Sequence, residues 1–531
     1  MSEAAGSESS VLARTAQGAA WMVAVRMVNR LLGLASVLIL ARLLTPEDFG
    51  LVALAFSIFG AIEACMAIGV ETQLMRTKDP DRKLYDTAFT LNLLRAGLLG
   101  LLLAVCAAPL AAYMREARLE TVILLLAAYA ASGGLTNIGT VDFMRNLDFR
   151  RDFILQASPR LVQALTGIVL AFLLRDYWAL LIAICVGRIA TLILGYAMRP
   201  YRPRLTLVAW RSLVSVSFWS WMLGIAYMLR DRLDNLVIGR TLGPVQVGLY
   251  SVSSEIAQLP TSELVGPITN ASMPGFAASL RADAKANTAD AFLRIAALTV
   301  LIAMPTGLGV SLVAAPVVLL ALGPAWQAAA PLIAVLSIAM IPVALGMIAS
   351  ALMVAHLRIR RVCMVTACAA ALRIGILITV VPQFGLTGLV WGVAAALAAE
   401  NLLLVSSGLS ITGADPRRLL GGLWRPLIAG GAMALLLWSM GLGWAPPVAG
   451  FGPAIGSLAT SVSVGFLTYV SVLAALWFAA GRPSGAETDF VMMARRVLGS
   501  AMPVLHRLAS TLGLAGQVGR PVPAPQPRSE P

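Results

Sequence analysis

The stretch LRDRLDNLVIGRTLGPVQVGLY, residues 229–250, decides how this chain can fold. It places a group of charged side chains inside what otherwise reads as a membrane helix, and it ends in an Arg-x-Leu-x-Pro-x-x-x-Gly-Leu turn from Arg240 to Leu249. The same turn occurs once before, from Arg42 to Leu51, at a constant offset of 198 residues. Because each copy separates two long apolar runs, we interpret the pair as an internal repeat, which is typical of the related lobes of a transporter. The alternative is that each turn only ends one helix and starts the next.

The composition is that of a membrane protein. The 531 residues are 59% hydrophobic and 12% charged, and the mean hydropathy is +0.84. A soluble domain carries about twice that share of charged residues. Hydrocarbon cannot satisfy backbone amides, so the spanning elements are helices or closed barrels, and apolar runs of about twenty residues favour helices. The sequence therefore predicts an all-α integral membrane protein.

Hydropathy predicts fourteen spans arranged as two pseudo-symmetric lobes of six helices and two extra helices. The spans lie near 18–41, 49–72, 88–112, 119–142, 154–174, 178–198, 212–239, 248–274, 291–313, 328–354, 362–381, 386–410, 423–443 and 456–480. The expected units are a cytoplasmic segment (1–17), an N-lobe with helices 1–6 (18–211), a C-lobe with helices 7–12 (212–410), helices 13–14 (411–480) and a cytoplasmic tail (481–531).

Charge in the loops predicts the orientation. The loops on one side carry only Arg42, Arg115, Arg118, Arg175 and Arg240, and those on the other side carry several times as many Lys and Arg residues. Basic residues accumulate on the side that is not translocated, so we expect both termini in the cytoplasm. The net charge of +14 is then a consequence of topology, and no nucleic-acid partner is expected.

The tail predicts contact with membrane lipids. Apolar residues recur at three- and four-residue steps from Phe490 to Leu512 with arginines between them, which is typical of an amphipathic helix on a membrane surface. The Pro-rich end, residues 520–528, is expected to be disordered.

No catalytic motif is present in the sequence. It lacks a Gly-x-x-x-x-Gly-Lys loop, a Gly-x-Ser-x-Gly elbow and a His-Glu-x-x-His pair. The pair Asp79 and Asp81 lies in a short loop that we interpret as solvated, and the loops expected outside are too short for a catalytic domain. With two histidines and five cysteines without metal-site spacing, we expect no enzyme, no cofactor and no metal.

Charged residues inside the spans are the candidate site. A charged side chain at a helix centre costs about 2.5–3.5 kcal/mol, so it should face a partner or a wet cavity. Because guanidinium groups bind phosphate oxygens, the spacing of Arg26 and Arg30 on one helical face predicts a cavity for an anionic head group. The candidate substrate-binding residues are Arg26, Asn29, Arg30, Arg188 and Arg232. The alternative is that these arginines only pair with Glu63 and helix ends or reach the membrane surface.

A second set of polar residues could couple transport to an ion or form a gate. Asp231, Asp234 and Asn235 are expected on one helical face, where they could bind a proton or sodium ion or be neutralised by Arg232 or by an arginine of the other lobe. Glu400 could do the same or serve helix packing. The full set is Glu63, Asp231, Asp234, Asn235 and Glu400.

Together these features resemble the Wzx-type polysaccharide flippases of the multidrug/oligosaccharidyl-lipid/polysaccharide exporter superfamily. The residues that carry the resemblance are Arg42–Leu51, Asp234–Ser251, Leu259-Pro260, Leu320–Trp326 and Phe384–Gly392. The resemblance implies two six-helix lobes forming a V around a cavity, with two helices outside. It also implies transport of undecaprenyl-diphosphate-linked oligosaccharide by alternating access, driven by an ion gradient, for exopolysaccharide, O-antigen or capsule. Polysaccharide polymerases or export machinery would be its partners.

Three other functions compete with this interpretation. A multidrug/cation antiporter of the same superfamily would have an acid-dominated cavity, whereas the first lobe here is rich in arginine. A polymerase or ligase would need a large outer loop. A non-transporting scaffold of a polysaccharide export complex would tolerate substitutions of the cavity arginines.

Overall fold

The computed structural model describes residue 21 and residues 25–66, 69–77, 80–213, 218–281, 285–444, 450–483 and 485–492, and these contain helices and no strand. A first helix covers residues 25–43. The elements that follow are α2 (Pro46–Cys65), α3 (Val70–Arg76), α4 (Arg82–Met114), α5 (Arg118–Gly133), η1 (Ile138–Thr140), α6 (Val141–Arg145), α7 (Phe149–Leu174), α8 (Trp178–Met198), α9 (Trp210–Leu213), α10 (Phe218–Leu242), α11 (Pro244–Pro260), η2 (Thr261–Val265), α12 (Gly266–Arg281), α13 (Lys285–Leu312), α14 (Ala314–Ala321), η3 (Pro324–Ala329), α15 (Ala330–Ala355), α16 (Ile359–Thr412), α17 (Pro416–Ser439) and α18 (Phe451–Ala479).

Ten of the described helices are long and apolar enough to cross a membrane, and an eleventh span results if one bent pair is counted. The three other predicted spans fall on the helix over 25–43, on α10 and on α11–η2–α12. In α10 the cluster from Arg230 to Asp234 lowers the mean hydropathy, so this helix is recognised by its packing rather than by its composition. The protein is a multi-pass helical membrane protein.

The fourth predicted span is not continuous, which corrects the expected helix over 119–142. Helix α5 ends at Gly133, and the η1–α6 segment continues at an angle of 62° to it. The break follows Gly133-Gly134, where helix propensity is low. The side chain of Asn137 then starts the new segment by accepting a hydrogen bond from Gly139 N, while its amide donates to the Gly195 carbonyl of α8 at 2.9 Å.

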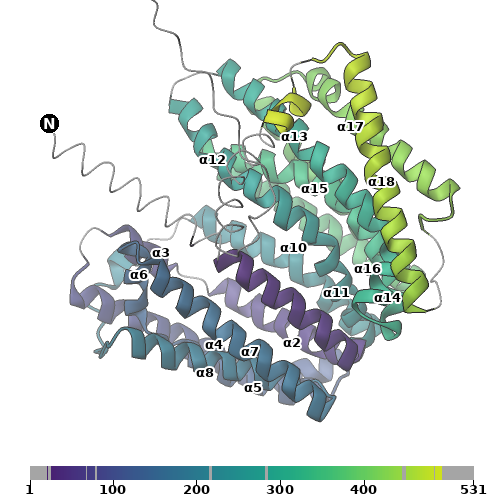
Figure 1. Ribbon diagram of the computed structural model, residues 1–531. Coiled ribbons are helices and arrows are strands. Elements are labelled where there is room, and N and C mark those ends of the chain that lie inside the picture. Colours follow the sequence, from purple (N-terminus) through teal and green to yellow (C-terminus); the bar gives the residue numbers. More distant parts are fainter. Residues whose placement is uncertain are drawn as a thin grey trace, which may run out of the picture.

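The helices form two bundles (Figure 1). The first bundle contains the helix over 25–43 and α2–α8, and the second contains α10–α16. The bundles lie side by side where α2 meets α10 and α11, and they spread apart toward α3 and α12 (Figure 1). One hydrophobic core extends through the shared region and includes Leu51 and Leu54 of α2 with Ile238 and Val247 of the second bundle.

The two repeated turns pack against each other at this contact. A Cβ atom on Gly50 would collide with the Pro244 carbonyl oxygen, and a Cβ atom on Gly248 would collide with the Pro46 carbonyl oxygen. Both glycines therefore allow α2 and α11 to cross with their backbones in direct contact. The reciprocal contacts show that the sequence repeat corresponds to a pseudo-two-fold relation between the two turns.

The helices that follow the two turns, α2 and α11, begin with different N-terminal caps. Thr45 caps α2 through a capping box with Asp48, and Pro46 occupies the first turn of the helix. The equivalent position of the second turn is Gly243, with a φ of +87° that favours glycine.

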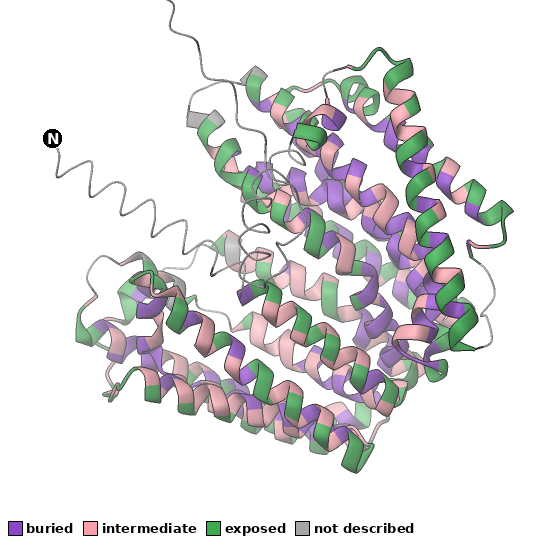
Figure 2. Ribbon diagram, viewed as in Figure 1, coloured by how far each residue is buried: buried purple, intermediate pink, exposed green. Residues whose placement is uncertain are grey.

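Helices α17 and α18 lie outside the second bundle, next to α13 and α14. Only 11% of the α18 span is buried, against 61% of the span that contains α15, and Figure 2 shows α18 as largely exposed. Residues 486–492 begin the tail as a helical segment, which is attached to α17 by a buried ion pair between Arg425 and Glu487 at 3.3 Å. The remainder of the predicted amphipathic helix and the segment 1–17 lie outside the described residues.

The eighth predicted span changes helix type at its middle. The α-helix α11 ends at Pro260, the π-helical segment η2 covers Thr261–Val265, and α12 follows. Proline cannot donate a backbone hydrogen bond, so Pro260 and Pro267 interrupt the i→i−4 pattern on both sides of η2. A π-helical turn inside a long helix is frequently found at a functional site.

Candidate functional site

The two bundles are held together at the end of the molecule that carries the repeated turns, here named the closed end. Trp326 of η3 is fully buried, and its indole N–H donates to the Ala41 carbonyl of the first helix at 2.7 Å. Its ring also packs edge-on against Phe49 of α2, with the ring centroids 5.3 Å apart. A buried indole with its N–H satisfied across two bundles contributes both apolar area and a directed contact.

The arginine of each repeated turn reaches across to the other bundle. The guanidinium of Arg42 donates to the Leu320 carbonyl and to the Ala321 carbonyl at the end of α14. The guanidinium of Arg240 lies 5.1 Å from the ring centroid of Tyr113 near the end of α4. Arginine at a helix C-terminus satisfies carbonyl groups that the helix itself leaves free. The closed end is thus fixed by reciprocal contacts.

Midway between the bundles, Arg30 of the first helix contacts η2 of the second bundle. Arg30 Nε lies 2.8 Å from Glu263 Oε1, and Nη2 donates to Ser262 Oγ at 3.3 Å. The two charged side chains remain 31% and 39% exposed. In this contact Arg30 points toward the second bundle and pairs with Glu263, which the sequence did not assign to the site.

Two of the other predicted residues, Arg26 and Asn29, lie beside Arg30 on the first helix, and a third, Arg232, lies on α10. Arg26 is exposed one helical turn away, and it has no ion pair within the described ranges. The Asn29 side-chain oxygen is buried and has no hydrogen-bond partner among the described residues. Arg232 of α10 is exposed, and its Nε lies beside Gly60 of α2. The two guanidinium groups of Arg26 and Arg232 are therefore accessible to a ligand, whereas the Asn29 oxygen is a buried acceptor without a partner among the described residues.

Arg188 is held inside the first bundle. Its guanidinium carbon lies 4.3 Å from the ring centroid of Tyr129, and its side chain passes Gly133. A cation–π contact of this kind stabilises the charge, while the buried Arg188 Nε has no hydrogen-bond partner among the described residues. The structure does not place Arg188 beside Arg30.

Glu63 of α2 faces Arg95 of α4, with their charged atoms 3.9 Å apart. Arg95 also lines a pocket of about 390 Å³ between α2, α4 and α10. Trp221 of α10 borders the same pocket and donates to the Cys65 carbonyl at 3.3 Å. Glu63 keeps 44% of its side chain exposed, so it remains accessible to a proton or a cation.

The single polar face predicted for α10 is divided, which corrects that expectation. Asp231 is 55% exposed and pairs with its neighbour Arg230 at 2.8 Å. Asn235 is buried and donates to Ser57 of α2 at 3.0 Å, so it joins the two bundles. Asp234 is buried as well, but it points into the second bundle. The close packing of α2 and α16 on either side of α10 separates these three side chains.

Asp234 is neutralised neither by Arg232 nor by an arginine of the first bundle. Arg373 of α16 binds it through two hydrogen bonds, of which the Nε to Oδ1 bond measures 2.9 Å. The Tyr250 hydroxyl donates to the same carboxylate and accepts from Arg373 at 3.2 Å. Carboxylate, guanidinium and phenol thus complete one another, which is the condition for burying an ion pair at low cost.

Glu400 is buried 3.3 Å from Arg230. The adjacent Asn401 packs against Gly346 of α15 and donates to its own helix at the Leu397 carbonyl. Both residues of this pair therefore serve contacts within the second bundle.

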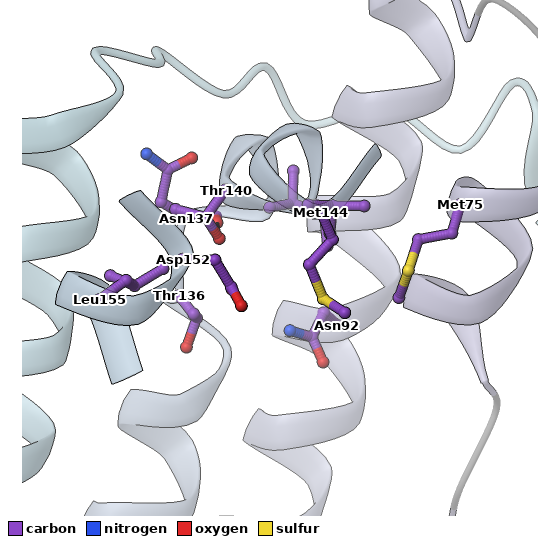
Figure 3. Close-up of a pocket in the computed structure, with 10 residues that line it drawn as sticks. Met75, Asn92, Thr136, Asn137, Thr140, Met144, Asp152 and Leu155 are labelled. Atoms are coloured by element: carbon purple, nitrogen blue, oxygen red, sulfur yellow. Dashed lines mark hydrogen bonds between the residues drawn. The ribbon is translucent and has the colours of Figure 1, made fainter. Parts of the chain in front are cut away.

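A smaller cavity of about 120 Å³ lies within the first bundle (Figure 3). Asn92, Thr136 and Asp152 line it together with Met75 and Met144 (Figure 3). Asp152 accepts a hydrogen bond from Gln156 at 2.7 Å. The cavity involves only the first bundle, so it does not belong to the interface around Arg30.

The sequence analysis named Arg30 and Asp234 as site residues but did not identify the residues that contact them. Glu263 and Ser262 could have been found as polar residues within an apolar span. The pairing of Arg373 with Asp234 joins positions 139 apart in the chain, and no local pattern indicates it.

Comparison with known proteins agrees with this architecture. The family model described as "Polysaccharide biosynthesis protein" matches residues 39–331, more than half of the chain. The succinoglycan biosynthesis transport protein ExoT of Rhizobium meliloti (strain 1021) is 27% identical over 305 residues, which cover 56% of this chain and 61% of ExoT. The lipopolysaccharide biosynthesis protein WzxC of Escherichia coli (strain K12) is 24% identical over 341 residues, which cover 61% of this chain and 66% of WzxC. The similarity thus spans just under two thirds of either relative.

Two solved structures share the fold. The lipid II flippase MurJ in an inward closed conformation superposes with a TM-score of 0.68 at 12% identity, covering 87% of this chain and 100% of MurJ. An inward-facing multidrug resistance MATE family transporter of the MOP superfamily superposes with a TM-score of 0.53 at 16% identity, covering 72% of this chain and 94% of the transporter. The chain therefore has the fold of these membrane transporters, and it belongs to the polysaccharide biosynthesis protein family.

Proposed function

We propose that this protein is a flippase that moves an undecaprenyl-diphosphate-linked oligosaccharide across the bacterial inner membrane by alternating access. The observation that carries the proposal is the contact of Arg30 with Glu263 and Ser262 between two bundles whose backbones meet directly at the closed end. The names of ExoT and WzxC, which associate them with succinoglycan and lipopolysaccharide, support the substrate class.

The charged groups between the bundles fit a diphosphate. Arg26 and Arg30 lie one turn apart on the same face, and a guanidinium binds phosphate oxygens through two parallel hydrogen bonds. Arg232 faces the same interface from α10. The Arg30–Glu263 pair is half-exposed, so Arg30 can exchange its carboxylate partner for a phosphate without a large desolvation cost.

We assign the closed end to the extracytoplasmic side, in agreement with the distribution of basic loops. Both termini then lie in the cytoplasm, and the described state admits substrate from the inner leaflet. Transport requires the Arg42 and Arg240 contacts to separate while the bundles close at the opposite end.

We assign ion coupling to Glu63 and Asp231. These are the candidate acids that stay accessible, with 44% and 55% of their side chains exposed. Asp234 and Glu400 are buried against arginines of their own bundle, where a cation from solution does not reach them.

The test is a flipping assay with the purified chain in proteoliposomes that contain a fluorescent undecaprenyl-diphosphate oligosaccharide. We expect the wild-type chain to expose the lipid to an external quencher or glycosidase, and the Arg26→Ala and Arg30→Ala variants to do so at least tenfold more slowly. Glu120→Gln, an exposed position at the start of α5, is the control. Equal rates of lipid exposure in liposomes with and without the protein, or full activity of both arginine variants, would contradict the proposal.

A further inference from the structure

A row of polar side chains on the eighth span faces the first helix, and the proposed phosphate site does not use it. Ser254, Gln258 and Ser262 recur at four-residue steps, which places them on one face of a helix. The side-chain amide of Gln258 donates to Ser254 Oγ at 2.8 Å, which confirms that they are neighbours. With Glu255 and Glu263 beside them, we name these residues the α11 stripe.

The stripe is exposed although it lies in a membrane span. Glu255, Gln258, Ser262 and Glu263 are all exposed, whereas Ile256 on the opposite face is buried. Exposed carboxylates at this depth are costly against lipid and are retained where they meet a partner or water. The exposed face of the eighth span is thus polar, whereas a helix that faces lipid exposes an apolar face.

Contacts to Arg30 show what the stripe faces. Arg30 reaches Ser262 and Glu263 at the lower end of the stripe, and it interacts electrostatically with Glu255 two turns further along. The stripe therefore lies on the side of the second bundle that faces the first helix. It extends from the level of Arg30 toward the closed end for about 12 Å, from the helical rise per residue.

The π-helical segment extends the stripe by one residue. In an α-helix only Ser262 would follow Gln258 on the same face, but the wider i→i+5 turn of η2 also brings Glu263 there. Ser262 Oγ donates to Glu263 Oε1 at 3.0 Å, and both contact Arg30. The irregular turn thus places a hydroxyl and a carboxylate side by side at the guanidinium.

The chemistry of the stripe is that of a sugar site. Carboxylates accept hydrogen bonds from hydroxyl groups, the Gln258 amide both donates and accepts, and the serine hydroxyls do the same. We propose that the α11 stripe binds the hydroxyl groups of the transported glycan, and that it prefers uncharged sugars. This proposal rests on the proposed function, because the lipid diphosphate at Arg26 and Arg30 fixes the level at which the sugars begin.

The position of the stripe allows one lipid-linked head group to contact two sites, the arginines through its diphosphate and the stripe through its sugars. Entry of the diphosphate gives Arg30 a phosphate partner and releases Glu263, which then accepts hydrogen bonds from the first sugar. The following sugars lie along Gln258 and Glu255 toward the closed end. The two carboxylates repel uronic acids and other acidic sugars, so the stripe selects by exclusion as well as by contact.

The experiment compares three probes on the full chain in nanodiscs. The probes are undecaprenyl diphosphate without sugar, the same lipid with a neutral oligosaccharide, and the same lipid with an oligosaccharide that ends in a uronic acid. We expect Gln258→Ala to weaken binding of the neutral glycolipid about tenfold and to leave binding of the sugar-free lipid unchanged, because only the glycan reaches this residue. We expect Glu255→Gln to shift the ratio of affinities toward the acidic glycolipid.

Two variants serve as controls. Glu120→Gln removes an exposed carboxylate at the start of α5 and should change none of the three affinities. Gln258→Asn keeps the amide and should recover part of the lost affinity. Melting temperatures verify that each variant is folded.

The possible failures are distinguishable. If the wild-type chain binds none of the three lipids, the proposed function fails and the stripe with it. If it binds them but Gln258→Ala weakens the sugar-free and glycosylated lipids equally, or neither, then the stripe does not bind the glycan. An unchanged ratio in Glu255→Gln would refute the exclusion of acidic sugars.

Discussion

Two of the guanidinium–carboxylate pairs in the membrane helices of this protein differ in their surroundings. Arg373 and Asp234 are 9% and 2% exposed, lie within one bundle and share the hydroxyl of Tyr250. Arg30 and Glu263 are 31% and 39% exposed and join two bundles. The first pair is almost completely buried and its carboxylate accepts bonds from both Arg373 and Tyr250, whereas the second is open to exchange.

The difference shows which charge holds the fold and which can act on a ligand. A buried pair cannot be opened without leaving a charge in a low-dielectric interior. A half-exposed pair contributes little to stability, since water and ions replace the partner at small cost. From sequence alone both pairs are arginines and acids inside apolar runs.

The largest effect is expected from breaking the buried pair. Asp234→Ala leaves the Arg373 guanidinium buried and unpaired, so we expect a loss of about 3–5 kcal/mol in the free energy of unfolding, seen as a large drop in melting temperature in detergent. The double variant Asp234→Leu/Arg373→Met should recover most of the loss, because no charge remains. If the single variant is as stable as the wild type, the pair is not structural.

Exchanging the charges of the open pair sharpens the comparison. The variant Arg30→Glu/Glu263→Arg keeps an ion pair between the bundles, so the melting temperature should stay near that of the wild type. Transport of the lipid-linked oligosaccharide should nevertheless fall about 10–100-fold, since a charge-assisted contact to phosphate contributes about 1.5–3 kcal/mol. Retained transport in a folded charge-exchanged variant would mean that pairing, not phosphate binding, is the role of Arg30.

Local sequence patterns predicted part of the fold that positions these two pairs. The repeat from Arg42 and Arg240 to Gly50 and Gly248 is a pattern of fixed spacing, and the structure shows it as a crossing of α2 and α11. The all-α fold class and the two outer helices, α17 and α18, were also predicted from the apolar runs. The sequence could not indicate that the fourth span bends at Gly133, because glycine occurs in many straight helices of this chain.

Pairing across the chain was beyond the sequence for a physical reason. Asp234 is one of several acids near α10, and its partner is chosen by how α16 packs on it. Burial decides the role of each acid, and burial depends on all neighbouring helices together. The predicted site thus contained Arg30, which contacts the second bundle, but it lacked Glu263 and grouped Asp234 with residues of a different environment.

A smaller effect is expected from a neutral contact between the bundles. Asn235 donates to Ser57 at 3.0 Å, and both side chains are buried. We expect Asn235→Ala and Ser57→Ala each to lower the free energy of unfolding by about 1 kcal/mol, and the double variant to lose less than the sum. Strict additivity in a double-mutant cycle of melting curves would show that this hydrogen bond does not couple the bundles.

The smallest effect is expected for a third arginine, Arg118, at the closed end. Its side chain is the most exposed of the three arginines that are compared. Arg118 donates to Glu116 at 2.8 Å and also pairs with Glu47 of α2. The hydrogen bond from Arg118 lowers the pKa of Glu116, more than its partial burial raises it. Because the folded pKa lies below the ordinary value, the contribution to stability is present at neutral pH and is lost as the pH falls through the lowered pKa.

The variant Arg118→Gln should therefore lower the free energy of unfolding by only about 0.2–1 kcal/mol at pH 7 and have less effect still at an acidic pH below the lowered pKa of Glu116, where this carboxyl group is protonated in both proteins. Melting curves at the two pH values, with Glu120→Gln as the matched surface control, measure this difference. A loss as large as that of Asp234→Ala would mean that exposure does not separate the arginine pairs of this protein, and the assignment of Arg30 to substrate rather than to the fold would lose its physical basis. A small, pH-dependent loss would place Arg118 at one end of a graded series, in which Arg373 is fixed by burial and Arg30 lies between them.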